Sequence, residues 1–443
     1  MQTIRTPLPQ LLERHATYET HPPLYFLQLR AWAHIFGGSL AALRANSALV
    51  GTLTLIAFYA LVRRYALGLF ALAFMAFAPL PLAYSQEMRP YALAVFLAVC
   101  AAWSTERTVG AGHRARPQSE SGGSSDVVGR HSGLPLQVFF WTALLYTHYW
   151  GAFVCAAQGV YALAAARTPD ARRRVIWAGV ISVALFACWL PILHRQLHAI
   201  GALSFWVDPP SVINLGKTVV AYTGVMFKVA SSAFRMPGPL PILILIGACH
   251  LLLLGWGITA APRLAVAWLA LGLALPWALS YAMHGLYVWY RYPVLMWPAY
   301  ALIVASGLRR LRWPALRGLL MGVLIGAEAV GLWRYFSGWQ KANPKAVVAF
   351  VDAYAPLHPL VIRPAYFSFL YKYYDQGRTQ PLDTDAFDSL AKRAALRGHV
   401  IFLLGFDDAP DPIRDAFLAE FHRIGQRRFP GFGHLGITVY VLK

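Results

Sequence analysis

A short polar stretch holds the two side chains best suited to chemistry. In the sequence YSQEMRPY, residues 84–91, the Glu87 carboxylate and the Arg89 guanidinium stand two residues apart, between apolar runs at 66–83 and 91–105. Charged groups at the ends of two membrane helices cost hydration energy, so they usually mark a functional site. A carboxylate can act as a base or a metal ligand, and a guanidinium fork can bind two oxygens of one anion. A Glu–Arg pair that caps the two helices and serves structure alone is the alternative.

These groups need membrane helices to position them. Of the 443 residues, 58% are hydrophobic and only 13% are charged, and the mean hydropathy is +0.48. A soluble protein of this length needs roughly 25% charged residues to cover its surface. Because the apolar runs match the thickness of a bilayer core, we expect an all-α polytopic membrane bundle of about ten transmembrane helices. The runs lie at 41–62, 66–83, 91–105, 135–150, 152–166, 175–193, 240–259, 264–283, 292–308 and 315–336.

The basic residues indicate orientation in the membrane rather than binding of nucleic acid. The formal net charge is +20, but the Lys and Arg residues cluster in short loops between the apolar runs. One alternating set of loops is rich in them: Arg63, Arg64, Arg107, Arg114, Arg116, Arg130, Arg167, Arg172, Arg173, Arg174, Arg263, Arg309, Arg310, Arg312 and Arg317. The opposite set holds only Arg89, Arg195, Lys217, Lys228, Arg235 and Arg291. The richer set is expected in the cytoplasm, so the poorer set should face outward.

Segments outside the apolar runs divide the chain further. Residues 1–39 should form an outward loop with an interfacial helix, and residues 40–336 the transmembrane domain. Within that domain, 106–134 is Gly/Ser/Arg-rich and reads as a flexible cytoplasmic linker. The outward segment 194–239 is too long for a mere connector and is expected to be a partly helical lid or a passive interfacial helix. From 337 to 443, alternating helix-like and strand-like patterns predict a small outward α/β domain.

Three motifs together resemble a known superfamily. YSQEMRPYAL at 84–93, THPPLYF at 20–26 and YTHYWGAF at 146–153 resemble bacterial GT-C membrane glycosyltransferases. These are the protein-mannosyltransferase-like and aminoarabinose-transferase-like enzymes that use polyprenyl-phosphate sugars. The resemblance implies a multi-pass protein of the bacterial inner membrane, with its site and C-terminal domain in the periplasm. It also implies transfer of a sugar, with inversion, to an envelope glycan, lipid A or protein.

The resemblance implies roles for individual residues. It implies Glu87 as a catalytic carboxylate, with Glu19 as a weaker substitute for the family's acidic residue. Arg89, Arg291 and Tyr292 are expected to meet the donor phosphate. The cavity is expected to be lined by His21, Tyr91, His148, Tyr149 and Lys217. For His148 the alternative is a buried histidine bonded to a neighbouring helix. For Arg291 it is a snorkelling arginine in an aromatic belt.

Metal ligation and the start of the chain bear on whether the chain is active. The four cysteines form no C-x-x-C pair, which predicts no zinc site. A divalent metal held by Glu87 is the one cofactor that we consider. Family members begin with a helix crossing outward and a loop bearing Asp-Glu, and Met1 falls inside the corresponding loop. We therefore expect the natural start to lie upstream. If the first helix and its Asp are absent, a non-catalytic polyprenyl-lipid binding or translocation protein is the alternative function.

Overall fold

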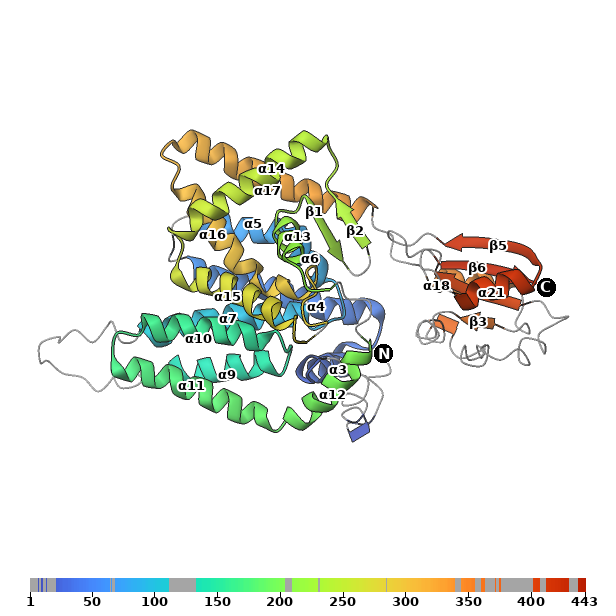
Figure 1. Cartoon of the computed structure of the whole chain (residues 1–443), viewed down its shortest axis with the longest axis horizontal. Coiled ribbons are helices and arrows are strands. Elements are labelled where there is room, and N and C mark those ends of the chain that lie inside the picture. The colour runs from blue at the N-terminus through green and yellow to red at the C-terminus, as the bar shows by residue number, and fades with distance from the viewer. Residues whose placement is uncertain are drawn as a thin grey trace, which may run out of the picture. The chain divides into compact units, whose positions relative to one another are not determined.

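The chain forms two compact units, one made of Met1–Val229 with Phe234–Trp333 and the other of Ala230–Ala233 with Arg334–Lys443. Figure 1 shows the computed structural model, with its elements labelled. The structure describes residues 7, 9, 10, 13, 21–63, 65, 68–110, 133–203, 209–229, 232–283, 285–338, 344–354, 360–362, 371, 374, 375, 401–406, 412–429 and 437–443.

The first unit is a bundle of helices. Their bounds are α3 Leu24–Phe36, α4 Leu40–Val62, α5 Gly68–Phe77, α6 Pro79–Ser85, α7 Tyr91–Gly110, α9 Gly133–Leu145, α10 Gly151–Ala165, α11 Pro169–Ala187, α12 Leu190–Leu203, α13 Val212–Tyr222, α14 Leu240–Ile258, α15 Arg263–Leu279, η2 Tyr292–Met296, α16 Trp297–Arg309 and α17 Pro314–Gly338. A two-stranded sheet, β1 Met226–Val229 and β2 Ser232–Arg235, stands between α13 and α14. Helix α7 packs between α4 and α9, and α10 packs against α15.

Each predicted apolar run forms a helix or a pair of helices, but fewer of them are long enough to cross a bilayer alone. Among the described residues, α4, α7, α14 and α17 have the length and composition of a span. Two bent pairs, α5 with α6 (60°) and α11 with α12 (68°), raise the number to six if each pair is one span. A helical membrane bundle with a small sheet-containing part is therefore confirmed, whereas the count of ten spans is not.

Prolines explain both bends. Ala78, between α5 and α6, has an extended backbone with φ −64° and ψ 120° because Pro79 follows it. In the second pair, Pro191 occupies the first turn of α12, where its missing N–H costs nothing but the preceding helix cannot continue through it. The first bend lets α6 end at Ser85, immediately before the turn that carries Glu87 and Arg89.

Two predicted loops contain more helix than expected. Helix α7 runs to Gly110, so the proposed linker loses residues 106–110 to the helix. The rest of that linker, 111–132, lies outside the described residues. The segment 194–239 contains the end of α12, all of α13 and the β1–β2 pair. Thr218 and Asn214 are buried on α13, which shows an amphipathic helix packed on the bundle.

Helices α14 and α16 approach each other closely through two glycines. A Cβ atom at Gly257 would lie 1.9 Å from the Ile303 carbonyl oxygen, and one at Gly307 would lie 2.0 Å from the Leu253 carbonyl oxygen. Small residues allow this backbone contact between membrane helices. Because α16 follows η2 directly, the contact also fixes the position of the segment that carries Arg291.

We expect alanine at Gly257 or Gly307 to destabilise the bundle, because either methyl group must push the two backbones apart. Overpacking of this kind typically costs about 1–3 kcal/mol. Gly255→Ala on the same helix is the matched control, since nothing lies within 4 Å of its added Cβ. Thermal unfolding of the purified protein in detergent checks the prediction. Equal midpoints for Gly255→Ala and Gly257→Ala would contradict it.

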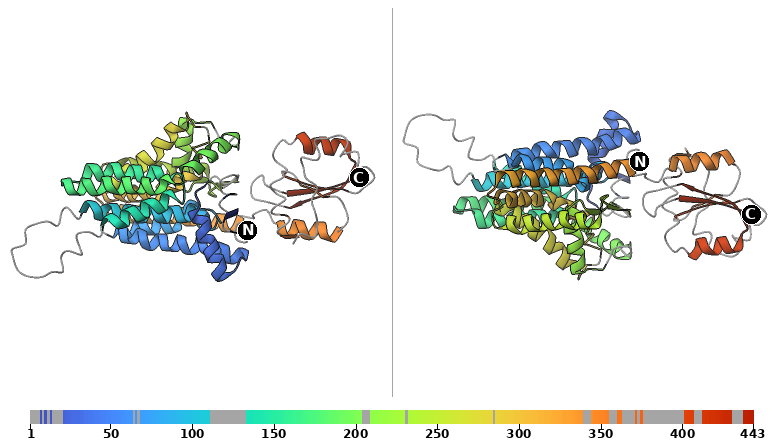
Figure 2. Two further views of the ribbon diagram at one scale, coloured as in Figure 1. Left: turned by 90° about the horizontal axis from the view of Figure 1, so that it is seen from below. Right: turned by 90° about the horizontal axis from the view of Figure 1, so that it is seen from above.

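The second unit is a small α/β fold with helices on both faces of one sheet. Its described elements are α18 Pro344–Tyr354, β3 Leu360–Ile362, β4 Ile401–Phe406, α21 Pro412–Glu420, β5 Arg423–Phe429 and β6 Ile437–Leu442. The strand order is β3-β4-β6-β5, parallel between β3 and β4 and antiparallel elsewhere. Figure 2 shows α18 and α21 on opposite faces. One face packs Val347 with Val439, and the other packs Leu403 with Phe421.

Candidate active site

Three connections and the start of α3 meet at one end of the bundle. The Leu24 amide donates to the Tyr146 carbonyl at 2.9 Å, which joins the start of α3 to the loop between α9 and α10. The turn 86–90 joins α6 to α7, and residues 280–291 join α15 to η2. The three sequence motifs therefore come together in space with the Arg291 segment, as the resemblance implied.

Six side chains form a packed group here, which we call the aromatic cluster: His21, Tyr84, Tyr91, His148, Trp150 and Tyr292. Ring centroids are 5.0 Å apart for His21 and His148, 5.1 Å for His148 and Tyr292, and 4.7 Å for Tyr84 and Tyr91. Tyr91 also lies 5.7 Å from His148 and 6.3 Å from Tyr292. Three of the residues predicted to line the cavity, His21, Tyr91 and His148, are thus in mutual contact.

The segment that carries Arg291 is held by side chains from three other parts of the chain. Its backbone carbonyls accept hydrogen bonds from Trp150 (Leu286 oxygen, 3.0 Å), Thr218 (Trp289 oxygen, 3.1 Å), Tyr84 (Tyr290 oxygen, 2.7 Å) and Tyr222 (Pro293 oxygen). Buried carbonyls are costly unless bonded, so each bond fixes the chain locally. The result is a rigid support for a cationic side chain.

Three charged groups converge on the aromatic cluster. Glu87, Arg89 and Arg291 all interact electrostatically with the Tyr91 hydroxyl. Arg291 is half-buried, donates a hydrogen bond to Tyr292 and lies with its Cζ 5.5 Å from the Tyr290 ring centroid. Arg89 is exposed and Glu87 is half-buried. Within the described part of the chain, neither Glu87 nor Arg89 forms an ion pair. Two guanidinium groups and one carboxylate thus lie close enough to Tyr91 to interact with it electrostatically.

His148 sits in the middle of the aromatic cluster in its neutral form. Its side chain is 3% exposed, and burial, reinforced by the neighbouring His21, lowers its pKa well below the ordinary value. Nδ1 accepts a hydrogen bond from the Trp150 amide at 3.1 Å. In the neutral ring the proton therefore sits on Nε2. Nε2 is buried and has no hydrogen-bond partner among the described residues, so it can donate to an oxygen of a bound molecule.

Two residues predicted to line the cavity lie to the side of the aromatic cluster. The Tyr149 hydroxyl donates to Gln196 and accepts from the Trp189 indole at 3.0 Å, so the structure does not bring Tyr149 into the cluster. Lys217 lies on α13 with its Nζ 5.6 Å from the Trp289 ring centroid. The predicted lid thus contacts the segment that carries Arg291.

Glu19 lies outside the described residues. In the described part of the chain, no group of three or more His, Cys, Asp or Glu side chains is close enough to hold a metal ion. Tyr84, Trp150 and Thr218 are not among the predicted site residues, although each anchors the Arg291 segment. A signal existed for the first of these, because Tyr84 and Tyr91 flank the charged turn symmetrically.

Comparisons with known proteins bear on the fold and on the N-terminal part of the chain. The family model for dolichyl-phosphate-mannose-protein mannosyltransferase matches residues 20–116, which contain the start of α3 and the charged turn. Two solved structures of ArnT from Cupriavidus metallidurans are similar to the chain: one in the apo state (TM-score 0.52) and one bound to undecaprenyl phosphate (TM-score 0.53). Both are 14% identical to it, and each match covers 95% of this chain and 87% of that chain. No protein of curated function matches the sequence.

These matches confirm the resemblance to the GT-C superfamily that the three motifs predicted. At this level of identity the structural likeness shows the fold, and the fold is that of a multi-pass membrane protein.

Proposed function

We propose that the chain is an inverting glycosyltransferase that moves a sugar from a polyprenyl-phosphate donor to an envelope acceptor (a glycan, lipid A or a protein). The observation that carries the proposal is the convergence of Glu87, Arg89, Arg291 and neutral His148 on one aromatic cluster. The printed description of the matching family, and the undecaprenyl phosphate bound to one ArnT structure, support a polyprenyl-phosphate donor.

In the proposed reaction the acceptor hydroxyl attacks the anomeric carbon from the side opposite the phosphate. The new bond joins the acceptor oxygen to that carbon, and the bond from the carbon to the phosphate oxygen breaks. The Glu87 carboxylate takes the hydroxyl proton. Negative charge grows on the departing polyprenyl phosphate, where the Arg291 fork, with Arg89, stabilises it. The Nε2–H group of His148 donates a hydrogen bond to an oxygen of the sugar phosphate.

In this reaction Arg89 and Arg291 supply positive charge for the phosphate, and the described residues contain no group of three or more His, Cys, Asp or Glu side chains that could hold a metal ion. We further propose that the reaction takes place at the periplasmic face of the bacterial inner membrane. The distribution of Lys and Arg among alternate loops supports this orientation. The C-terminal unit would then be periplasmic as well.

Purified protein in lipid nanodiscs tests the proposal with a panel of undecaprenyl-phosphate sugars and an envelope extract as acceptor. We expect release of undecaprenyl phosphate together with incorporation of the label into the extract. Mass analysis of envelope glycolipids from a deletion strain should show the same modification missing. Tight binding of the donor without release of any sugar would contradict catalysis and favour the alternative of a lipid-binding or translocation protein.

A further inference from the structure

A buried acidic side chain lies inside one of the membrane-spanning helices. Glu328 is near the middle of α17, which has the length and composition of a span, and the residue is only 1% exposed. Neither carboxylate oxygen has a hydrogen-bond partner among the described residues. An ionisable group inside the membrane region is costly, and it usually marks a site where something binds. The proposed reaction does not use Glu328, so its cost must be offset by another role.

The turn that follows α13 covers this carboxylate. Gly224, with φ +69°, belongs to that turn, and a Cβ atom there would lie 2.5 Å from one Glu328 oxygen and 3.1 Å from the other. The carboxylate therefore occupies the space that a side chain at this position would need. The Gly224 carbonyl oxygen lies 3.6 Å from the place of a Cβ atom at Gly331. Because Glu328 and Gly331 are three residues apart, they share the face of α17 on which the turn packs.

The backbone at this turn supplies hydrogen-bond acceptors that have no donors. Tyr222, Thr223 and Gly224 are buried, and their carbonyl groups accept no hydrogen bond within the described part of the chain. Buried carbonyl groups are normally bonded. These three also stand at the C-terminal end of α13, where the aligned peptide dipoles leave partial negative charge. A carboxylate beside them adds to that charge, so the missing partner is positive.

Tyr300 of α16 brings a further oxygen to the same place. Its hydroxyl interacts electrostatically with Glu328 and lies 2.7 Å from Nδ1 of His250 on α14. Since neither carboxylate oxygen is bonded to Tyr300, the hydroxyl donates its proton to Nδ1 and keeps its lone pairs for a ligand. His250 thus orients the Tyr300 oxygen as an acceptor.

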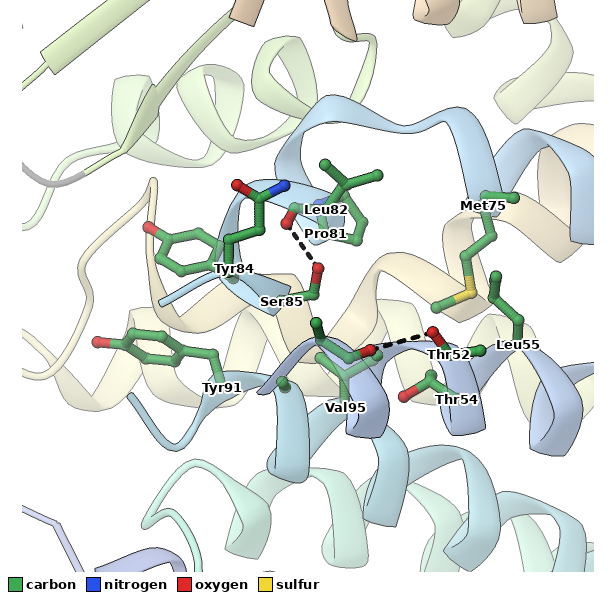
Figure 3. A pocket seen from close by; sticks show the side chains of 15 residues that line it. Thr52, Thr54, Leu55, Met75, Pro81, Leu82, Tyr84, Ser85, Tyr91 and Val95 are labelled. Carbon is green, nitrogen blue, oxygen red and sulfur yellow. Dashed lines mark hydrogen bonds between the residues drawn. The ribbon is translucent and has the colours of Figure 1, made fainter. Parts of the chain in front are cut away.

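Hydroxyl groups in the cavity beside α4 show the opposite condition. This cavity has a volume of about 260 Å³ and is lined by residues of α4, α5, α6 and α7. Figure 3 shows that Thr52 and Ser85 turn their hydroxyl groups back onto their own helices, where they donate to the Ala48 carbonyl at 3.1 Å and the Leu82 carbonyl at 2.7 Å. These hydroxyl groups need no polar ligand, whereas Glu328 does.

We propose that Glu328, the Tyr300 hydroxyl oxygen and the carbonyl groups at the end of α13 bind one monovalent alkali cation, Na⁺ or K⁺. All of these ligands are oxygens, which suit hard cations. A single positive charge neutralises the one carboxylate, whereas a divalent ion would leave a net charge buried in the bundle. Helix C-terminal ends and free backbone carbonyls bind Na⁺ at membrane depth in other protein folds.

The site would connect α16 and α17 to the helix that supports Arg291. On α13 the Tyr222 hydroxyl donates to the Pro293 carbonyl, and the Thr218 hydroxyl donates to the Trp289 carbonyl at 3.1 Å. An ion at the end of this helix therefore stabilises the support of the Arg291 segment. The inference concerns ion binding and stability, so it does not depend on whether the chain transfers a sugar.

Thermal unfolding of the purified full chain in detergent tests the inference. NaCl, KCl or choline chloride is added at the same ionic strength, so that screening stays constant and only the cation changes. At about ten times the Kd, Na⁺ or K⁺ should raise the midpoint by roughly 3 °C relative to choline. Isothermal titration calorimetry of the wild-type protein should show one ion bound per chain with the same Kd.

Three substitutions locate the ion. Glu328→Gln removes the charge but keeps the shape, and its amide can donate to the carbonyl groups, so its midpoint should be equal in all three salts. Glu106→Gln is the matched control, because that carboxylate on α7 accepts a bond from Tyr161 at 2.6 Å, and it should keep the full response. Tyr300→Phe removes one ligand and should weaken ion binding about tenfold, the usual order for one lost polar contact.

Several results would overturn the inference. A wild-type midpoint that is equal in Na⁺, K⁺ and choline, with no heat of binding, would exclude the ion. Equal responses of wild type and E328Q would place the ion elsewhere. An infrared band of a protonated carboxyl group that persists at high Na⁺ or K⁺ and is absent from E328Q would show that Glu328 holds a proton instead. If E328Q does not fold, the wild-type calorimetry and the affinity of Tyr300→Phe still decide, and an unchanged affinity in that variant contradicts the site.

Discussion

Arg291→Ala should lower kcat/KM for sugar transfer by about 10²–10³-fold, the usual cost of removing one group that stabilises developing charge. The side chain is held on a segment whose carbonyls accept bonds from Trp150, Thr218 and Tyr84, so its position is set before substrate arrives. A preorganised charge of this kind needs no rearrangement when the phosphate departs. Steady-state transfer from an undecaprenyl-phosphate sugar, measured in nanodiscs, checks the prediction.

The choice of substituent separates charge from geometry. Arg291→Lys keeps a positive charge but loses the planar fork, so we expect it to recover only part of the activity. Arg89 is exposed, and Arg89→Ala should cost less than Arg291→Ala because water screens its charge. Arg235→Ala is the control, since Arg235 is an exposed arginine of the same bundle end. Unchanged transfer by Arg291→Ala, with a folded protein, would contradict the phosphate role.

The lengths of the apolar runs in the sequence were sufficient to predict the helical bundle. The helix predicted within residues 1–39 is α3, and the runs at 41–62 and 240–259 match α4 and α14 within a residue. The bounds of these helices follow from the burial of apolar side chains in lipid, and the local sequence determines which side chains are apolar. The bends after α5 and α11 depend on which turn of the helix a proline occupies. The prolines in these runs, among them Pro79 and Pro191, predict kinks near the helix ends, and the bends of 60° and 68° occur close to them.

No strand pattern in the sequence predicts β5, because its first residues, 423–425, continue the helix-like stretch that begins at residue 411. Its sequence, RIGQRRF, is mostly exposed and carries charge on both sides of the strand. Among the described strands it pairs with β6 alone, at the edge of the sheet. Edge strands gain stability from the ladder to one neighbour rather than from alternating burial, and charged residues are common there. The run of buried apolar residues that marks β6 is missing from β5.

Spacing within one stretch predicted the charged part of the candidate site, but not what holds it. Glu87 and Arg89 were found because they interrupt apolar sequence. The bond from Tyr84 to Tyr290 joins residues 206 apart, and the bond from Trp150 to Leu286 joins residues 136 apart. Contacts of that separation follow from the packing of whole helices. The residues next to Tyr84 and Trp150 in the sequence do not indicate which carbonyl each side chain will bind.

Glu87→Gln should lower kcat by about 10²–10⁴-fold, the range expected when a general base is removed. Glutamine has nearly the same shape, so it can still hydrogen-bond the acceptor but cannot take its proton. Glu87→Asp keeps the carboxylate and should retain more activity. Glu106→Gln, on the far part of α7 where the carboxylate accepts a bond from Tyr161 at 2.6 Å, is the matched control.

A general base is identified by a variant that loses turnover but keeps its affinity for the donor. If Glu87 takes the proton, E87Q protein should bind undecaprenyl phosphate as tightly as wild type and lose only turnover. If Glu87 merely supports the turn between α6 and α7, the thermal midpoint and donor binding should fall together. Wild-type turnover by E87Q would show that another carboxylate takes the proton. Glu19 is the sequence candidate for that role, so E19Q belongs in the same series. A loss confined to E19Q would leave Glu87 as a group that orients the acceptor while the proton passes elsewhere.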